Sequence, residues 1–199
     1  MHIRKMKPHS GKLSPGCRIC MKGTWACIFL TMRCTRSCFF CPQDKQKLYS
    51  EKPNLDGIFF DSPEDSVAFL KKYRFEGVGL SGGEPFLVFE TLLSYISTIR
   101  REPGKQMYIW AYTNGDLVTK ERAKQLAKAG LNELRFDIAA RGYNFDPLLI
   151  AKKYLPTVTI ETPIIPEDKK LLSVALQKAK KYQISFINLH ELYRTPHNQ

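Results

Sequence analysis

From residue 25 onward, stretches typical of β-strands alternate with stretches typical of amphipathic helices. Runs rich in β-branched and aromatic residues precede segments whose apolar residues recur every three or four positions. Strands joined by helices form βαβ units, which place the strands parallel in one sheet. The predicted strands are residues 25–32, 78–81, 107–113, 133–139, 157–165 and 184–189. The predicted helices are residues 62–73, 92–99, 119–130, 146–153 and 171–179.

Chain length then limits how this sheet can close. A closed barrel of eight βα units needs about 250 residues, and this chain has 199. We therefore expect an α/β protein with a partial (β/α)6 TIM-like barrel, which is an open parallel six-stranded sheet. Residues 42–60 are polar and rich in turn-forming residues, so we predict a loop there.

The first 24 residues differ in composition from the rest of the chain. They contain six Lys or Arg and no Asp or Glu, which is half of the net charge of +12. We expect a basic N-terminal extension, residues 1–24, and a barrel domain, residues 25–199. The charge indicates contact with nucleic acid or another acidic partner, or else a solubilising lysine-rich surface.

Composition also limits where the protein works. Apolar residues make up 43% and charged residues 25%, which is ordinary for a folded globular chain. No apolar run approaches the ~20 residues that cross a bilayer, and no apolar signal segment follows the basic N-terminus. We expect a soluble cytoplasmic protein without membrane association.

All six cysteines lie within residues 17–41, too close together to connect distant parts of the chain as disulfides. Crowded thiols in an intracellular chain indicate metal or redox chemistry. Cys34, Cys38 and Cys41 form a C-x3-C-x2-C pattern directly after the first predicted strand. Thiolates suit iron–sulfur clusters and zinc, and three of them leave one iron of a four-iron cluster without a protein ligand. An open coordination position is typical of a catalytic metal.

A second motif, Gly82-Gly83-Glu84-Pro85, follows the second predicted strand. Glycines let the backbone approach a ligand closely, and Glu84 offers a carboxylate suited to an amino group. Alone, this pattern also fits a tight turn. One βα unit after the cysteine motif, it lies at the same carboxyl end of the sheet, where barrels carry their chemistry.

These two motifs, in this order, resemble the radical S-adenosylmethionine (SAM) superfamily and its pyruvate formate-lyase activating enzyme-like branch. The resemblance extends over residues 25–191. It implies a [4Fe–4S] cluster held by Cys34, Cys38 and Cys41, whose open iron binds the amino and carboxylate groups of SAM. The cluster would donate one electron, SAM would break, and a 5′-deoxyadenosyl radical would abstract hydrogen from the substrate.

The resemblance also assigns SAM-binding residues. Phe40 and its backbone would lie near the adenine, and Gly82, Gly83 and Glu84 would bind the methionine amino group. Thr113-Asn114-Gly115 resembles the motif at the end of the third strand in activating-enzyme-like members, which would bring Asn114 near SAM. The alternative is that Asn114 is a plain turn residue.

Three ionisable residues on the later strands have two interpretations each. Asp137, late in the fourth predicted strand, reaches the SAM ribose or the substrate, or is a structural acid with satisfied hydrogen bonds. Glu161 in the fifth predicted strand has the same two interpretations, as a contact of SAM or substrate or as a structural acid. His190, after the sixth strand, contacts adenine or substrate, or is a packing residue.

Three cysteines remain outside the C-x3-C-x2-C motif. Cys17 and Cys20 form a C-x2-C pair, which is an auxiliary metal site (zinc or a second iron–sulfur centre), a redox-active dithiol, or a tight turn with two free thiols. Gly16 and Gly23 flank the pair as turn residues would, which favours metal. Cys27 is expected to point into the core as a small apolar residue.

Three functions remain in competition. The first is a radical SAM enzyme that acts on a protein or peptide and receives electrons from a donor such as flavodoxin or ferredoxin. The second keeps this chemistry with RNA as substrate, gripped by the basic N-terminus and stacked on Trp25, Phe39 and Phe40. The third is a non-enzymatic, metal-stabilised nucleic-acid-binding module, for which cysteines should occur in complete sets of four.

Overall fold

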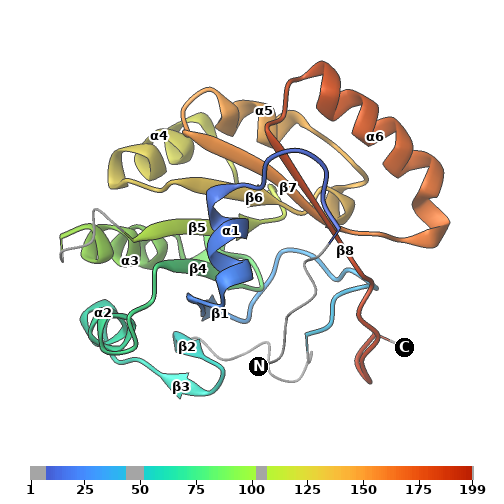
Figure 1. Cartoon of the computed structure of the whole chain (residues 1–199). Helices are drawn as coiled ribbons and strands as arrows, with labels where there is room; N and C mark the ends of the chain where they lie inside the picture. The colour runs from blue at the N-terminus through green and yellow to red at the C-terminus, as the bar shows by residue number, and fades with distance from the viewer. Residues whose placement is uncertain (1–7, 44–51, 102–106, 199) are drawn as a thin grey trace.

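A computed structural model describes residues 8–43, 52–101 and 107–198. Its strands form one sheet in the order β3-β2-β1-β4-β5-β6-β7-β8, which curves into an open barrel (Figure 1). Six neighbouring strands pair in parallel, as predicted. They are β1 (Trp25–Thr31), β4 (Gly77–Gly82), β5 (Tyr108–Thr113), β6 (Glu133–Phe136), β7 (Thr157–Pro163) and β8 (Phe186–His190).

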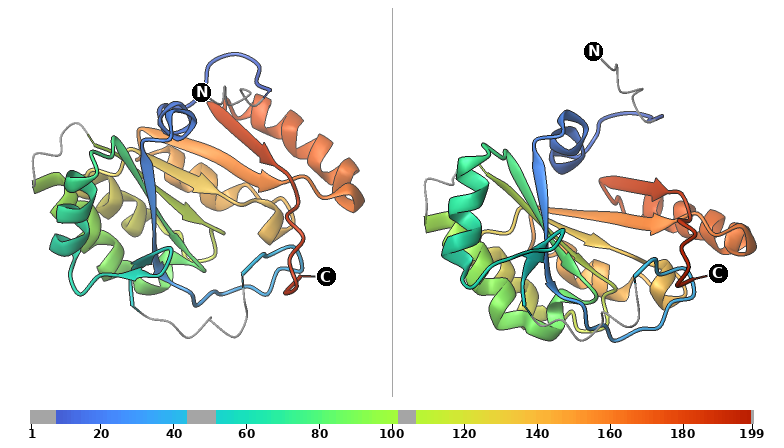
Figure 2. Two further views of the ribbon diagram at one scale, coloured as in Figure 1. Left: turned by 60° about the horizontal axis from the view of Figure 1, so that its bottom comes forward. Right: turned by 90° about the horizontal axis from the view of Figure 1, so that it is seen from below.

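Five helices cover the outside of the curved sheet (Figure 2). They are α2 (Pro63–Lys72), α3 (Phe89–Arg101), α4 (Lys120–Ala129), α5 (Asp146–Lys152) and α6 (Lys169–Lys181). Helix α2 starts where the sequence predicts, because Ser62 and Asp65 form a capping box. Helix α4 ends at Gly130, which adopts a left-handed conformation with φ 97°.

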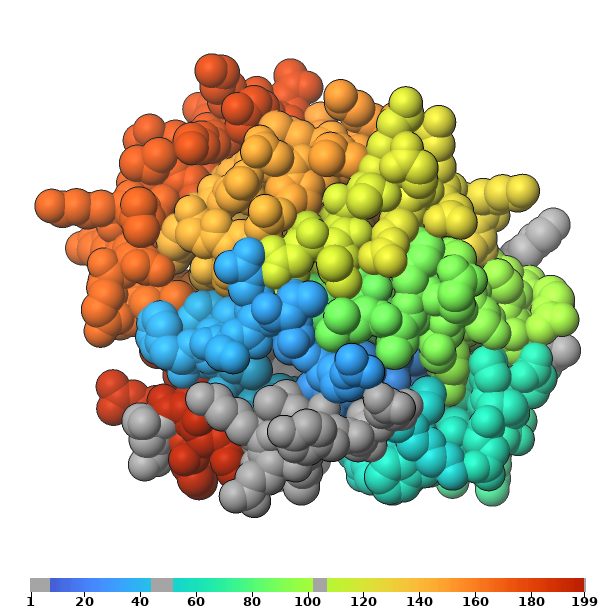
Figure 3. Space-filling model, turned by 180° about the vertical axis from the view of Figure 1, so that it is seen from behind, coloured from blue at the N-terminus to red at the C-terminus, as the bar shows by residue number. Residues whose placement is uncertain are grey.

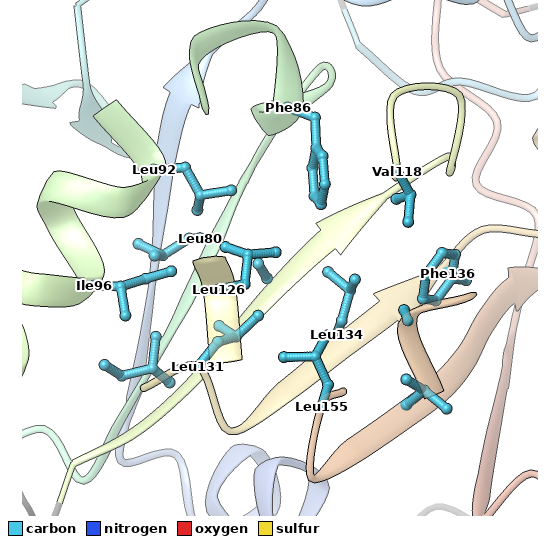
Figure 4. Close-up of a cluster of buried hydrophobic side chains, with 14 of the residues drawn as sticks. Leu80, Phe86, Leu92, Ile96, Val118, Leu126, Leu131, Leu134, Phe136 and Leu155 are labelled. Carbon is cyan, nitrogen blue, oxygen red and sulfur yellow. The ribbon is translucent and has the colours of Figure 1, made fainter. Parts of the chain in front are cut away.

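The core lies between these helices and the outward face of the strands. Alternate residues of each strand point outward, so Leu80 and Leu134 meet Leu92, Ile96 and other helix residues (Figure 4). These side chains are almost fully shielded from water. The opposite face of each strand points into the barrel, and its carboxyl end carries the candidate site.

The prediction of a loop over residues 42–60 is wrong in part. Strands β2 (Asn54–Leu55) and β3 (Ile58–Phe59) form a hairpin there, and β2 pairs antiparallel with β1, which extends the sheet to eight strands. Asp56 and Gly57 form its two-residue turn with φ of 46° and 89°. Asp-Gly between apolar residues is a strong hairpin signal, because both turn positions need positive φ.

The N-terminal extension contains an ordered helix, α1 (Pro15–Lys22), within its described residues. Ser14 caps it by accepting a hydrogen bond from the N–H of Cys17. The helix packs at the amino ends of β1, β4 and β5, opposite to the carboxyl ends (Figure 1). Residues 1–7, which hold three of the six basic residues, lie outside the described residues. The division of the chain at residue 24 stays a prediction.

Two predictions about β-strand residues need correction. Strand β6 ends at Phe136 rather than at residue 139, so Asp137 follows the strand instead of lying within it. Its carboxylate accepts a hydrogen bond from the N–H of Ala139, which turns the chain. Cys27 lies on the barrel-facing side of β1 and is partly buried, whereas its neighbours Ala26 and Ile28 face the core.

No helix among the described residues has both the length and the apolar composition to span a bilayer.

Candidate functional site

The three cysteines of the C-x3-C-x2-C motif line one cavity of about 290 Å³ at the carboxyl ends of the strands. They lie on the segment that follows β1 at this end of the barrel, residues 33–43, which we call the cysteine loop. Gly82 and Gly83 line the same cavity from the next strand. The structure thus brings together the two motifs that the sequence singles out.

The thiols of the loop are free and accessible. Cys34 is exposed, and Cys38 and Cys41 are partly exposed. Burial raises the pKa of Cys34, and it raises the pKa of Cys38 to about 11 against the opposing effect of Arg36. Both groups are therefore protonated thiols at neutral pH, and metal binding would release their protons.

The donor set fits an iron–sulfur cluster. Among residues 8–43, 52–101 and 107–198, no three Cys, His, Asp or Glu side chains lie close enough to hold a single metal ion. A four-iron cluster uses one thiolate per iron, so its ligands are spread farther apart than those of one ion. Three free thiols around one cavity meet that need.

The glycine pair lets two loops meet at backbone distance. The N–H of Gly83 donates to the Thr31 carbonyl at 2.8 Å, and the N–H of Glu84 donates to the Arg33 carbonyl at 2.8 Å. A Cβ on Gly83 would lie 2.1 Å from the Arg33 carbonyl oxygen. No other residue fits there without moving the start of the cysteine loop.

Glu84 lies beneath the cavity rather than in its lining. Its side chain is fully buried, and its carboxylate accepts hydrogen bonds from the N–H of Phe86, the hydroxyl of Thr113 and the N–H of Asn114, at 3.1, 2.9 and 2.7 Å. Burial raises its pKa to about 7 despite these donors. Glu84 therefore ties the glycine turn to the end of β5.

Asn114 and Asp137 both line the cavity, as a ligand-binding role requires. The Asn114 amide donates to the Thr35 hydroxyl at 2.9 Å and contacts the Cys34 sulfur at 3.7 Å. Asp137 accepts from the hydroxyl of Thr162 at 3.0 Å, and burial raises its pKa. A buried carboxylate with one side toward a cavity can accept hydrogen bonds from hydroxyl groups of a ligand.

Glu161 and His190 also reach the cavity. The Glu161 side chain also contacts residues of the barrel interior. One carboxylate oxygen lies 3.0 Å from the guanidinium of Arg135, and the other accepts a hydrogen bond from the side chain of Asn188. His190 ends β8 and contacts the Glu191 carbonyl through Nδ1 at 3.0 Å. The barrel interior is therefore ionic, since Arg135 also pairs with buried Glu133.

The segment after β8 crosses the edge of the cysteine loop. The Asn198 amide donates to the Phe40 carbonyl at 3.1 Å, and the Thr195 hydroxyl donates to the Pro42 carbonyl at 3.4 Å. Figure 3 shows this segment (red) beside the cysteine loop (light blue) on one face of the molecule. Phe40 and Tyr193 both line the cavity.

The C-x2-C pair lies at the opposite end of the barrel, on α1. Arg135 donates to the Cys17 sulfur at 3.8 Å. Burial raises the pKa of Cys27 to about 12, and the nearby Cys20 thiol adds a smaller rise. The described residues supply no third ligand for a metal ion next to the pair.

The aromatic residues expected to stack on RNA are divided between the barrel interior and the surface. Trp25 packs against Trp110 with ring centroids 5.7 Å apart. Phe39 is 64% exposed and meets Phe40 edge to face. Sequence reasoning missed four residues at the site: Arg36, Tyr112 and Tyr193, which line the cavity, and Asp116, which contacts Arg36. Arg36 occupies a variable position of the cysteine motif and the other three lie outside the motifs, so their residue types carry no signal.

Comparison of the sequence with known proteins identifies a matching family and several relatives. A family model described as the radical SAM superfamily matches residues 28–169. A protein of Methanocaldococcus jannaschii with the provisional name glycyl-radical enzyme activating enzyme is 27% identical over 192 residues, which cover 91% of this chain and 50% of the relative. A GTP 3′,8-cyclase of Aquifex aeolicus is 34% identical over 112 residues, which cover 56% of this chain and 33% of that protein. The chain thus spans half the length of the first relative and less of the second.

Solved structures share the fold. The structure of anSMEcpe with bound AdoMet superposes with a TM-score of 0.63 at 16% identity, over 87% of this chain and 53% of that chain. Streptococcus suis SuiB bound to S-adenosylmethionine gives a TM-score of 0.66 at 16% identity, over 87% of this chain and 41% of that chain. The family model covers well over half of the chain and includes both motifs. The chain therefore belongs to the radical SAM superfamily.

Proposed function

We propose that the chain is the catalytic barrel of a radical SAM enzyme, with a [4Fe–4S] cluster held by Cys34, Cys38 and Cys41. The observation that carries the proposal is the single cavity lined by these three free thiols and by the glycine pair. When bound, the cluster and SAM supply reductive cleavage of SAM and a radical that removes hydrogen from a substrate.

The chain's own residues would bind and orient SAM. The backbone at Gly82 and Gly83 would bind its amino group, and Glu84 would act from below by holding that turn against Asn114. Asn114 and Asp137 line the cavity and would contact the nucleoside, and Phe40 would lie near the adenine. Burial of these polar groups at the cavity wall supports the assignment, since they are oriented before a ligand arrives.

We further propose a protein or peptide substrate and a protein electron donor such as flavodoxin or ferredoxin. The relative that bears an activating-enzyme name supports the first, as does the related fold of SuiB, whose structure was solved with a precursor peptide. An exposed cluster is sensitive to oxygen, so a reducing compartment such as the cytoplasm suits it. An RNA substrate is the alternative that the charge of +12 keeps open.

The pair Cys17 and Cys20 would serve as ligands of a second metal, either zinc or an iron–sulfur centre. Both sit on one side of α1, three residues apart, which is the spacing of neighbours on a helix. Further ligands would have to come from outside the described residues.

The test begins with protein purified and reconstituted without oxygen. Iron and sulfide are counted per chain, dithionite and SAM are added, and 5′-deoxyadenosine is measured. We expect about four irons for the cluster on Cys34, Cys38 and Cys41 and formation of 5′-deoxyadenosine. Cys38→Ala should lose these irons and the product while the far-ultraviolet circular dichroism stays unchanged. Zinc without iron, or SAM cleavage in Cys38→Ala, would contradict the proposal.

A further inference from the structure

One carboxylate outside the cavity accepts three hydrogen bonds from the cysteine loop. Asp116 lies in the loop after β5, and its side chain is 15% exposed. It is not among the residues that line the cavity. Its partners are Thr35 and Arg36, which stand between the first two cysteines of the motif. The contact joins residues 80 positions apart in the chain.

The geometry of this contact is that of a two-pronged ion pair. Arg36 donates from Nε to one carboxylate oxygen of Asp116 and from Nη2 to the other, each at 2.6 Å. The Thr35 hydroxyl donates to the same carboxylate at 2.9 Å. Paired parallel hydrogen bonds fix the orientation of both groups, which a single contact does not.

Asp116 is itself held from two sides. Its N–H donates to the Asn114 side chain at 2.9 Å, and Arg141 from the loop after β6 lies 3.2 Å from its carboxylate. Arg141 also donates to the Gly115 carbonyl at 3.1 Å. The hydrogen bonds from Arg36 and Thr35 lower the pKa of Asp116, so it is ionised at neutral pH. The loops after β1, β5 and β6 are therefore joined at this carboxylate.

We infer that Asp116 is a positioning residue, which holds the segment between Cys34 and Cys38 in the shape that cluster binding needs. That this positioning serves cluster binding rests on the function proposed above, whereas the contacts of Asp116 are present in the chain without a cluster. A loop that is ordered in advance loses less conformational entropy when it binds its ligand. Isolated exposed ion pairs contribute little, but this one is two-pronged and part of a network, and its carboxylate side chain is only 15% exposed.

The first experiment uses the cluster-free chain and hydrogen exchange measured by mass spectrometry. Asp116→Ala is expected to raise the exchange rate of amides in residues 33–41 about tenfold or more, with the amides of β6 unchanged. Asp116→Asn, which keeps the shape and one acceptor, should give an intermediate rate. The control is Glu64→Gln, which removes a carboxylate from the exposed pair with Arg101 and should leave the loop unchanged.

Coupling between the two partners is then tested with Arg36→Ala and the double variant. If both changes break the same contact, the double variant exchanges no faster than the faster single variant. Wild-type exchange in Asp116→Ala and Asp116→Asn would overturn the inference, as would rates that multiply in the double variant. Because this arm needs no cluster, its outcome is independent of the proposed function.

The second experiment follows the reconstituted cluster. Iron release to a chelator should be about tenfold faster in Asp116→Ala than in the wild type, and the electron paramagnetic resonance lines of the reduced cluster should broaden, since the loop samples several shapes. A wild type that assembles no cluster would refute the proposed function and leave the exchange result to decide the positioning role. A wild type and Asp116→Ala with equal iron release and equal spectra would overturn the positioning role alone.

Discussion

The carboxylate of Glu84 accepts a hydrogen bond from the backbone N–H of Asn114 at 2.7 Å, although the two residues follow different strands. This bond joins the glycine turn after β4 to the loop after β5 beneath the cavity. An acid with no exposed surface in this place costs free energy whenever it is ionised, because it is removed from water. Its protonation state should therefore influence stability.

Stability should fall between about pH 4.5 and pH 7 because of Glu84. Its pKa rises from an ordinary value of 4.5 to about 7 on folding. In this range the folded state binds more protons than the unfolded state, so the free energy of unfolding decreases as pH rises, by about 3 kcal/mol in total. Glu84→Gln should flatten that slope, measured by denaturant unfolding of the cluster-free chain.

The control for this prediction is Glu121→Gln, an exposed acid on α4. It should keep the wild-type slope. A slope that survives in Glu84→Gln would assign the pH dependence to other groups, such as Asp137, whose pKa is also raised by burial.

Gly83→Ala should damage the fold at the site. The added methyl group would lie 2.1 Å from the Arg33 carbonyl, a backbone atom that cannot move without displacing the cysteine loop. We expect a loss of about 2 kcal/mol or more in the free energy of unfolding and weaker SAM binding to the reconstituted protein. Gly142→Ala, with positive φ but open space around it, should cost only about 1 kcal/mol from the backbone and leave SAM binding unchanged. Equal effects of the two variants would refute the steric argument.

Asp137→Asn should separate binding from folding. Asparagine keeps the side-chain oxygen that accepts from the N–H of Ala139 and the hydroxyl of Thr162, so unfolding should change by less than about 1 kcal/mol. Loss of the charge should weaken SAM binding about tenfold, since hydrogen bonds to charged groups are the stronger ones. Isothermal titration of the reconstituted protein measures it, with Thr162→Ser as the matched control. Wild-type affinity in Asp137→Asn would make Asp137 a structural acid.

Replacing Cys17 and Cys20 by serine should remove a second metal without affecting the first. Elemental analysis is expected to give a lower zinc or iron content, with SAM cleavage retained because the pair lies at the other end of the barrel from Cys34. The control is Cys27→Ser, which should keep the metal content. An unchanged metal content in the double variant would leave the pair as a dithiol or as free thiols.

The sequence was sufficient for the parts of the fold that depend on local pattern. Six parallel strands follow from the alternation of strand and helix signals, and the meeting of Cys34 with Gly83 follows from parallel strands having their carboxyl ends on one edge. The hairpin at Asp56-Gly57 was missed, because residues 42–60 were predicted to be a loop, although Asp-Gly is a signal for a turn with two positive φ angles.

Contacts between distant residues were not readable. Nothing in the sequence around Arg36 indicates that its partner is Asp116, because only the folded barrel brings their loops together. The burial of Glu84 is similar: the motif predicts a carboxylate at the cavity edge, whereas the turn geometry directs its side chain inward. The orientation of Cys27 was also not readable. Both faces of a barrel strand are largely enclosed, so alternation alone does not show which residues of β1 face the barrel interior.

The packing of Trp25 against Trp110 gives the molecule an internal optical probe. These are the two tryptophans of the sequence, and both rings lie inside the barrel, where the Arg135 guanidinium sits 5.0 Å from the ring centre of Trp110. A Cβ on Gly77 would touch both the Trp110 ring and Ile19 of α1, so the helix and the ring share one packing site. Intrinsic fluorescence therefore reports on the docking of α1 and on the charge beside it. The hydrogen bond from Trp110 Nε1 to the Tyr112 hydroxyl at 2.9 Å also connects the probe to a residue that lines the cavity.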